Sequence, residues 1–593
     1  CLVKISRMHF RFLFQLGLQR KLFSFISILM MAGFLLIQCL PSLALAQTEV
    51  PLEAQSGIIE KSLSPTAPKF EPPPETEAPK ITNKNEPLPT GTDVGPKFFV
   101  KKIKLTGNTM ISDEILMPLI DLGEGRDVDL MILNTMANKI TALYSSKGYL
   151  LARAFVPKQE ILDDTVEMVI TEGRINKVLV QGNKNLSKQN IQQRMKMVQE
   201  EAVLQEQTLE RVLLELNEMM GVSVTTVLKP GELPGTSDLV LEVTESQPYT
   251  FSFDSNNFGS VYTGPVGFGY SGTYANIFTL GDQFSARYTT SNKELHAYSP
   301  SYTFPINAYG TRAKVSYTFS ENELGYTLEP LAAGGSSHSI GLEISQLLHK
   351  SRTASFSTRL GLDIKSSANE ASGTNTSKDN LVNVSLGFGG DLTDSYLGRT
   401  FYDLKFQLGL NEEDTTRGLG SRAAGTGEVF STNINLTRMQ STVFLNSYLI
   451  LKLTGQIDNT RALSPYLYGV GGMGTVRGYP ISAYSGDMGF NVSGEHTIPF
   501  PWSVKWANTD LSQVVSFISF LEHGQIYIRD EQPGEVDEHI TGAGGGLKIT
   551  LPKKNESDVG INFAITYGAP VFNSIPPTDG STDFVYLNGM INY

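Results

Sequence analysis

The sequence has few of the residues that carry metal, cofactor or nucleophile chemistry. Its 593 residues include two cysteines, at positions 1 and 39, seven histidines and two tryptophans. Beyond position 39 the chain therefore has no cysteine for a disulfide framework, a metal site or a nucleophile. The histidines are scattered, and the sequence lacks a Gly-x-Ser-x-Gly elbow, a P-loop lysine and a His-Glu-x-x-His motif. We therefore predict no enzymatic activity, no catalytic residue, no cofactor and no metal.

Positive charge is also scarce. The 48 Lys and Arg residues are outnumbered by 60 Asp and Glu residues, which gives a net charge of -12. A nucleic-acid partner is thereby disfavoured, because binding to phosphates needs a basic face. Charged residues make up only 18% of the chain and hydrophobic residues 40%, which argues against disorder and against a coiled coil. The 55 Gly, 23 Tyr and 31 Phe instead favour sheet and tight turns.

The first 46 residues are predicted to be a signal peptide. Basic residues up to Lys21 precede an apolar run at 23–37, and Ala44-Leu45-Ala46 offers a small-residue cleavage site. A retained anchor is the alternative, although the run is short for a hydrocarbon core of about 30 Å. Cleavage would leave 43 basic against 60 acidic residues, a net charge of -17. No later stretch has 18 consecutive apolar residues, which leaves the periplasm, the exterior or an outer-membrane β-barrel.

Three regions follow the signal peptide. Residues 47–96 hold ten of the 29 prolines and are predicted to be an extended linker, with a short helix at 52–63. Residues 97–173 and 174–246 form two β-α-α-β-β repeats of about 75 residues, each with a Gly-Asn turn after its first strand. Two small α+β domains of no special role are the alternative. The predicted strands are 98–105, 150–157, 165–172, 175–180, 222–228 and 239–244, and the predicted helices are 112–122, 130–147, 187–198 and 207–219.

Residues 249–593 alternate strictly between apolar and polar side chains. In one run Leu360, Leu362 and Ile364 alternate with Arg359 and Asp363, and similar runs of about ten residues recur through this region. Such strands suit a wall between lipid and a wet lumen, which predicts a transmembrane antiparallel β-barrel. A soluble β-sandwich is the alternative, but its charged faces would leave a very large polar surface.

This organisation resembles the two-partner secretion transporters (TpsB proteins of the haemolysin secretion/activation type, ShlB/FhaC/HecB), whose repeats are POTRA domains. The POTRA resemblance lies in the turns Gly107-Asn108 and Gly182-Asn183 and in Glu172-Gly173. The barrel resemblance is most specific at Val476-Arg477-Gly478-Tyr479, the family's signature on a loop that folds back into the lumen. The resemblance implies 16 strands and a periplasmic location for the POTRA domains.

The family's loop arginine pairs with an Asp in a Phe-x-Asp-x-Gly pattern on a neighbouring strand. Here Phe520, Glu522 and Gly524 occupy that pattern, so Glu522 is the expected partner of Arg477. Physical reasoning agrees, because an arginine carried into a lumen on a glycine-rich loop needs a carboxylate.

The resemblance implies an outer-membrane transporter that captures an unfolded partner exoprotein of the TpsA type, such as a haemolysin, an adhesin or a haem-binding protein, and passes it through the barrel. It also implies contact with outer-membrane lipid and insertion by the barrel-assembly machinery. The alternatives are a barrel-assembly factor of the same superfamily and a passive porin. Of these two, the porin would need neither POTRA domains nor the loop signature.

Overall fold

The computed structural model describes residues 51–63, 81–83, 96–411, 420–506, 509–553, 558–572 and 579–593. The predicted signal peptide, 1–46, and most of the predicted linker lie outside these residues. Among the described residues, no helix is both long enough and apolar enough to span a membrane.

Two parts of the predicted linker have regular structure. A 3-10 turn, η1 (Leu52–Ala54), and a helix, α2 (Ser56–Leu63), confirm the short helix predicted at 52–63. The strand β1 (Ile81–Asn83) was not predicted, and it pairs in parallel with a strand of the second repeat. The prediction of an extended linker was therefore wrong at β1, because this segment gains a partner strand that a composition argument does not reveal.

The first repeat is an α+β domain with a core of buried side chains around Ile103, Ile140 and Tyr144. Its main helix begins at Asp129, whose carboxylate accepts a hydrogen bond from the backbone N–H of Ile132 at 2.9 Å, a standard N-cap. The elements are β2 (Phe98–Val100), β3 (Lys102–Thr106), α3 (Asp113–Leu116), β4 (Arg126–Val128), α4 (Leu130–Ser146), β5 (Arg153–Phe155) and β6 (Thr165–Thr171).

Three predictions for this domain were wrong in detail. The strand expected at 98–105 is divided at Lys101, because β2 pairs with the unpredicted β4 whereas β3 pairs with β6. The helix expected at 112–122 ends at Leu116 and continues as 3-10 turns, since Pro118 has no N–H to donate. The strand expected at 150–157 is only three residues long.

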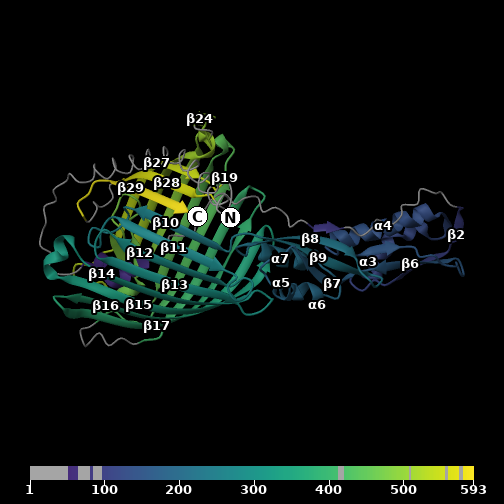
Figure 1. Cartoon of the computed structure of the whole chain (residues 1–593), viewed down its shortest axis with the longest axis horizontal. Helices are drawn as coiled ribbons and strands as arrows, with labels where there is room; N and C mark the ends of the chain where they lie inside the picture. Colours follow the sequence, from purple (N-terminus) through teal and green to yellow (C-terminus); the bar gives the residue numbers. More distant parts are fainter. Residues whose placement is uncertain are drawn as a thin grey trace, which may run out of the picture. The chain divides into compact units, whose positions relative to one another are not determined.

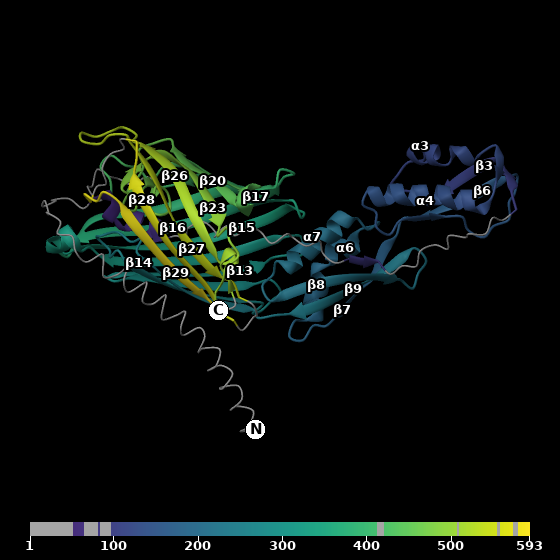
Figure 2. The same cartoon turned by 90° about the horizontal axis from the view of Figure 1, so that it is seen from above.

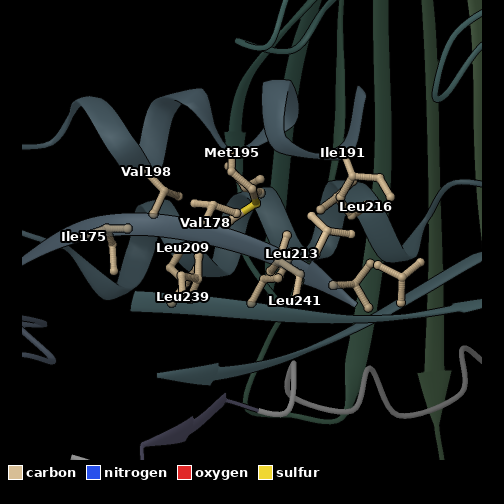
Figure 3. Packing of buried hydrophobic residues seen from close by; sticks show 14 of the residues in the cluster. Ile175, Val178, Ile191, Met195, Val198, Leu209, Leu213, Leu216, Leu239 and Leu241 are labelled. Carbon is tan, nitrogen blue, oxygen red and sulfur yellow. The ribbon is translucent and has the colours of Figure 1, made fainter. Parts of the chain in front are cut away.

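The second repeat packs its helices on one face of a sheet with the order β1-β8-β9-β7. Figure 3 shows the core, in which Val178 and Leu241 from the strands meet Leu213 from α7 and Met195 from the junction of α5 and α6. The helix expected at 187–198 breaks at Met195, whose N–H bonds to the carbonyl of Gln192 three residues back. The elements are β7 (Arg174–Gln181), α5 (Lys188–Arg194), α6 (Lys196–Glu200), α7 (Glu206–Asn217), β8 (Val222–Pro230) and β9 (Thr236–Glu245).

The C-terminal part is a closed barrel of 16 antiparallel strands among the described residues, which confirms the predicted fold class (Figures 1 and 2). The first strand pairs with the last, so the sheet has no free edge. The strands are β10 (Tyr249–Asn256), β11 (Gly267–Ala275), β12 (Gln283–Ser291), β13 (Leu295–Pro305), β14 (Thr311–Glu323), β15 (Ala333–Lys350), β16 (Ala354–Ala371), β17 (Thr374–Thr393), β18 (Gly398–Gly409), β19 (Phe430–Ser441), β20 (Tyr448–Asp458), β23 (Met488–Pro499), β26 (Val515–Tyr527), β27 (Glu538–Leu551), β28 (Gly560–Pro570) and β29 (Phe584–Asn592).

The alternation of side chains sets the two faces of this wall. Leu360 and Ile364 are at least half exposed on the outer face, whereas Lys365 and Ser367 of the same strand face the interior and contact α2. Strands β15 to β17 have 18 to 20 residues and are longer than the predicted ten. Because the strands run up and down, their connections alternate between the near end, where β10 starts, and the opposite far end.

Candidate functional site

The connection between β20 and β23, residues 459–487, lies inside the far end of the barrel. It contains a small hairpin of β21 (Tyr468–Val470) and β22 (Tyr484–Gly486). At the tip of this connection, Val476 and Tyr479 are fully buried. Val476 lies against two glycines of the inner wall, Gly524 on β26 and Gly542 on β27. We call residues 459–487 the lumen loop.

The structure places Arg477 directly against Glu522. The Nε and Nη2 atoms of Arg477 lie 3.0 and 2.6 Å from Oε1 of Glu522, and the backbone N–H of Arg477 donates to Oε2 at 2.7 Å. Glu495 on β23 is a second carboxylate partner, 2.8 Å from Nη1. Both Arg477 and Glu522 are 4% exposed, so this is a buried ion pair with multidentate hydrogen bonds.

The residues Phe520, Glu522 and Gly524 share the inner face of β26 because they alternate along the strand. The Phe520 ring lies under the guanidinium of Arg477, with 3.5 Å between the guanidinium carbon and the ring centroid. A Cβ at position 524 would lie 3.0 Å from the side chains of Val470 and Val476. Each position of this pattern thus contacts the loop in a different way.

The last two residues of the loop signature contact the closing strands. Gly478 has φ +101°, and a Cβ there would come within 2.8 Å of the backbone of Ala569, so only glycine fits without strain. Its N–H donates to Oη of Tyr586 at 2.9 Å, and that hydroxyl donates to the carbonyl of Tyr479 at 3.2 Å. Sequence reasoning missed Tyr586, because alternation alone gives no signal for its partner.

The helix α2 also lies inside the barrel. Its first residue, Ser56, donates its backbone N–H to Asn369 Oδ1 at 2.9 Å, and Glu60 forms an ion pair with Lys365 at 2.8 Å. On its other side, Nζ of Lys61 donates to the carbonyl of Leu467 at 2.7 Å and to Gln456 Oε1 at 3.3 Å. The helix therefore spans the interior from the β15–β16 wall to the base of the lumen loop.

The Gly-Asn turns of the two repeats are built alike. Gly107 and Gly182 have φ values of +89° and +82°, and a Cβ at either would clash with a backbone carbonyl of the last strand of the repeat. The side-chain amides of Asn108 and Asn183 each donate to a carbonyl three residues on, at 3.0 and 2.7 Å. These four predicted residues shape turns, and they lie far in sequence from the lumen-loop site.

A glutamate at the end of each repeat ties down its turn. Burial alone would raise the pKa of Glu172, but hydrogen bonds from Thr109, Met110 and Tyr144 together lower it. Glu245 is equivalent in the second repeat: its pKa is lowered by backbone N–H groups of residues 184–186 in spite of burial. Burial and the bond to Glu172 raise the pKa of Tyr144. The two repeats thus share this hydrogen-bond pattern as well as their order of elements.

No metal chemistry is evident in the part of the chain that the structure describes, where no three His, Cys, Asp or Glu side chains are grouped to hold an ion. The site is instead a closed, polar barrel interior occupied by two segments of the same chain, α2 and the lumen loop. Both are held by hydrogen bonds and ion pairs, which water can replace when the segments move. Both also have apolar contacts, because Ile59 of α2 lies in a buried cluster with Leu328, and Val476 of the lumen loop lies in one with Ile526.

Comparison with known proteins agrees with this geometry. The sequence model described as "Haemolysin secretion/activation protein ShlB/FhaC/HecB" matches residues 235–549, and that of the "POTRA domain, ShlB-type" matches residues 98–173. The heme/hemopexin transporter protein HuxB of Haemophilus influenzae is 24% identical over 433 residues, which cover 70% of this chain and 75% of HuxB. The outer membrane transporter CdiB of Dickeya dadantii is 23% identical over 305 residues, 49% of this chain and 53% of CdiB.

The solved structures agree in fold. CdiB from Escherichia coli superposes with a TM-score of 0.67 at 18% identity, covering 86% of this chain and 93% of that one. BamA from Haemophilus ducreyi lacking POTRA domains 1-3 gives a TM-score of 0.50 at 14% identity, covering 84% of this chain and all of that one. The barrel, the preceding POTRA domain and the match over more than half of the sequence lead to one assignment. The chain belongs to the haemolysin secretion/activation protein family (ShlB/FhaC/HecB), outer-membrane β-barrel transporters of two-partner secretion with POTRA domains in the periplasm.

Proposed function

We propose that this transporter captures an unfolded partner exoprotein with its POTRA domains and passes it through the barrel to the cell surface. The observation that carries the proposal is the barrel interior: α2 and the lumen loop occupy it, and many of their contacts with the wall are polar ones that can be exchanged for water or for a passing chain. In the resting state the pore is closed from within. The periplasmic end is the near end, and the far end is extracellular.

The second POTRA domain has one sheet edge suited to capture. On β8, Thr226, Val227 and Leu228 pair with the three residues of β1, which come from the linker. A short parallel strand adds few hydrogen bonds, so an extended client segment can compete for the same backbone groups. Capture at this edge would release the linker, which leads back to α2 in the barrel.

The opposite edge of that sheet is poorly suited to capture. Strand β7 has a register shift between Ile175 and Val178, and the amide of Gln192 already donates to the carbonyl of Val178 at 2.8 Å. A bulge, or a carbonyl that already accepts a hydrogen bond, hinders a further strand from pairing with a sheet edge. The groove of about 580 Å³ between this edge and α5 is therefore a weaker candidate for client binding, although its wall is rich in glutamine.

The alternatives make different demands on the barrel interior. A passive porin conducts through an open lumen, whereas here two segments obstruct it. A barrel-assembly factor of the same superfamily shares the fold, but nothing in the described interior favours that role. HuxB is named for heme and hemopexin, so a haem-binding exoprotein is one candidate client. Insertion by the barrel-assembly machinery and contact with outer-membrane lipid are further proposals that the family suggests.

Secretion of a candidate exoprotein encoded beside the transporter gene tests the proposal. Deleting residues 97–245 should leave an inserted, heat-modifiable barrel that retains the client in the cell. Thr82→Pro, which removes a backbone donor from β1, should strengthen client binding to the full-length protein. Normal secretion by the deletion variant would refute client docking on the POTRA domains, and steady high conductance of the unaltered protein would favour a porin.

A further inference from the structure

A second group of buried charges lies at the extracellular end, apart from the Arg477 site. Nη1 of Arg422 lies 2.6 Å from Oδ1 of Asp487. Arg461 binds both carboxylate oxygens of Glu535, at 2.7 and 2.8 Å, and Nη2 of Arg422 is 3.7 Å from the same carboxylate. The arginine side chains are 4% exposed, that of Asp487 is fully buried and that of Glu535 is 24% exposed. We call these four residues the extracellular clasp.

The clasp joins segments that are far apart in the sequence. Arg422 lies between β18 and β19, Glu535 lies between β26 and β27, and the other two lie at the start and the end of the lumen loop. Asp487 also accepts the backbone N–H groups of Ala462 at 2.7 Å and Arg529 at 2.8 Å. Three extracellular connections are thus held together at one point above the barrel interior.

Hydrogen bonds continue from the clasp to α2. The amide of Gln456 donates to Tyr466 O at 2.6 Å and lies 3.5 Å from the carbonyl of Asp487. Nζ of Lys61 on α2 donates to the side-chain oxygen of Gln456 at 3.3 Å and to the carbonyl of Leu467 at 2.7 Å. When α2 leaves, these carbonyls and the Gln456 oxygen lose a charged donor, so the base of the lumen loop becomes less firmly held.

We propose that Arg422, Arg461, Asp487 and Glu535 close the extracellular mouth of the barrel at rest and separate when a chain leaves the lumen. This inference rests on the proposed function, transport through the barrel. Buried ion pairs are suited to such a closure. In the open state water hydrates the separated charges, and in the closed state the pairs form in only one arrangement of the loops. The clasp differs from the Arg477 pair, which holds the loop tip against β26.

Accessibility of a buried position beside the clasp tests this inference without a client. Ser464 is 1% exposed and contacts the β18–β19 connection, so Ser464→Cys should react slowly with an impermeant maleimide added to intact cells. Combining it with Arg461→Gln or Asp487→Asn should speed the reaction by roughly tenfold or more, since a lost charge-assisted hydrogen bond shifts an equilibrium by about that factor.

Three controls belong to this experiment. Glu428→Cys is exposed on the same connection and should react quickly in every background. Arg438→Gln removes an ion pair of similar length, 2.7 Å to Asp394, at the periplasmic end and should leave the reaction at Ser464→Cys unchanged. The chain without an added cysteine gives the background signal.

A cross-link provides a second test if Asp487→Asn fails to fold. Thr426 and Ala462 form an isolated parallel bridge, so a cysteine pair there has the backbone spacing for a disulfide across the clasp. The oxidised, full-length protein should open less often in planar phospholipid bilayers than the reduced one. Equal opening in both states, or unchanged labelling in both charge variants of a properly inserted barrel, would overturn the inference. If labelling and channel opening change as expected but the chain secretes no client, the clasp inference stands and the proposed function is contradicted.

Discussion

Replacing Arg477 by alanine should cost stability but should cost transport more. The side chain loses both bonds to Glu522, the contact with Glu495 and the stacking on Phe520. Truncating one partner of a fully buried pair costs about 3–5 kcal/mol, because the other charge remains without compensation. We expect a loss near the lower end of that range, since Ser493 still donates to Glu522 at 3.1 Å and Glu495 is 24% exposed.

Two variants of Glu522 separate charge from side-chain length. Glu522→Gln keeps the length and loses the charge, so secretion should fall; Glu522→Asp keeps the charge, so secretion should be largely retained. Glu522→Ala should destabilise less than Arg477→Ala, because Arg477 keeps Glu495. The double variant Arg477→Ala with Glu522→Ala should cost less than the sum of the single changes, with a coupling energy of about 0.5–3 kcal/mol.

The assays are the temperature at which the barrel unfolds in detergent, seen as a change in gel mobility, and the fraction of client that reaches the medium. Insertion should be normal in all five variants, because the closed barrel keeps its backbone hydrogen bonds. Additive losses in the double variant, or full secretion by Arg477→Ala, would show that the two side chains do not act as one unit.

Three further predictions follow from single contacts. Gly478→Ala should abolish secretion in an inserted barrel, because a Cβ there meets the Ala569 backbone, whereas Gly534→Ala, also at positive φ but in open space, should secrete normally. Lys61→Met should raise the frequency of channel openings in planar bilayers, since α2 loses its charged contacts with the loop base; an unchanged frequency would refute this role. The lowered pKa of Glu172 means that it stabilises the first POTRA domain fully above about pH 4.5, its ordinary value, and progressively less as the pH falls through the lowered pKa. Thermal unfolding followed from pH 7 to pH 3 should therefore show a steeper loss for the unaltered chain than for Glu172→Gln.

The order of elements and the barrel could be predicted from the sequence because strands and helices each space their apolar residues with a different period. Alternation over two residues marks the barrel strands, as in the run from Arg359 to Ile364. A change to helical spacing marks α4 and α7. Local breaks at Lys101 and Met195 were not predicted, because they depend on which neighbour each half of the element pairs with or packs against.

The pairing of Arg477 with Glu522 was expected from family resemblance and from the physical need of a lumen arginine for a carboxylate. Nothing in the sequence pointed to Tyr586, which lies 108 residues from Gly478, or to Asn369, which lies 313 residues from Ser56. Alternation states which residues share a face, but not which residues lie opposite them inside the barrel. The sequence alone thus determined a barrel preceded by two α+β repeats. Only barrel closure decided that α2, the lumen loop and the extracellular clasp meet, because strand register and tilt bring their distant partners together.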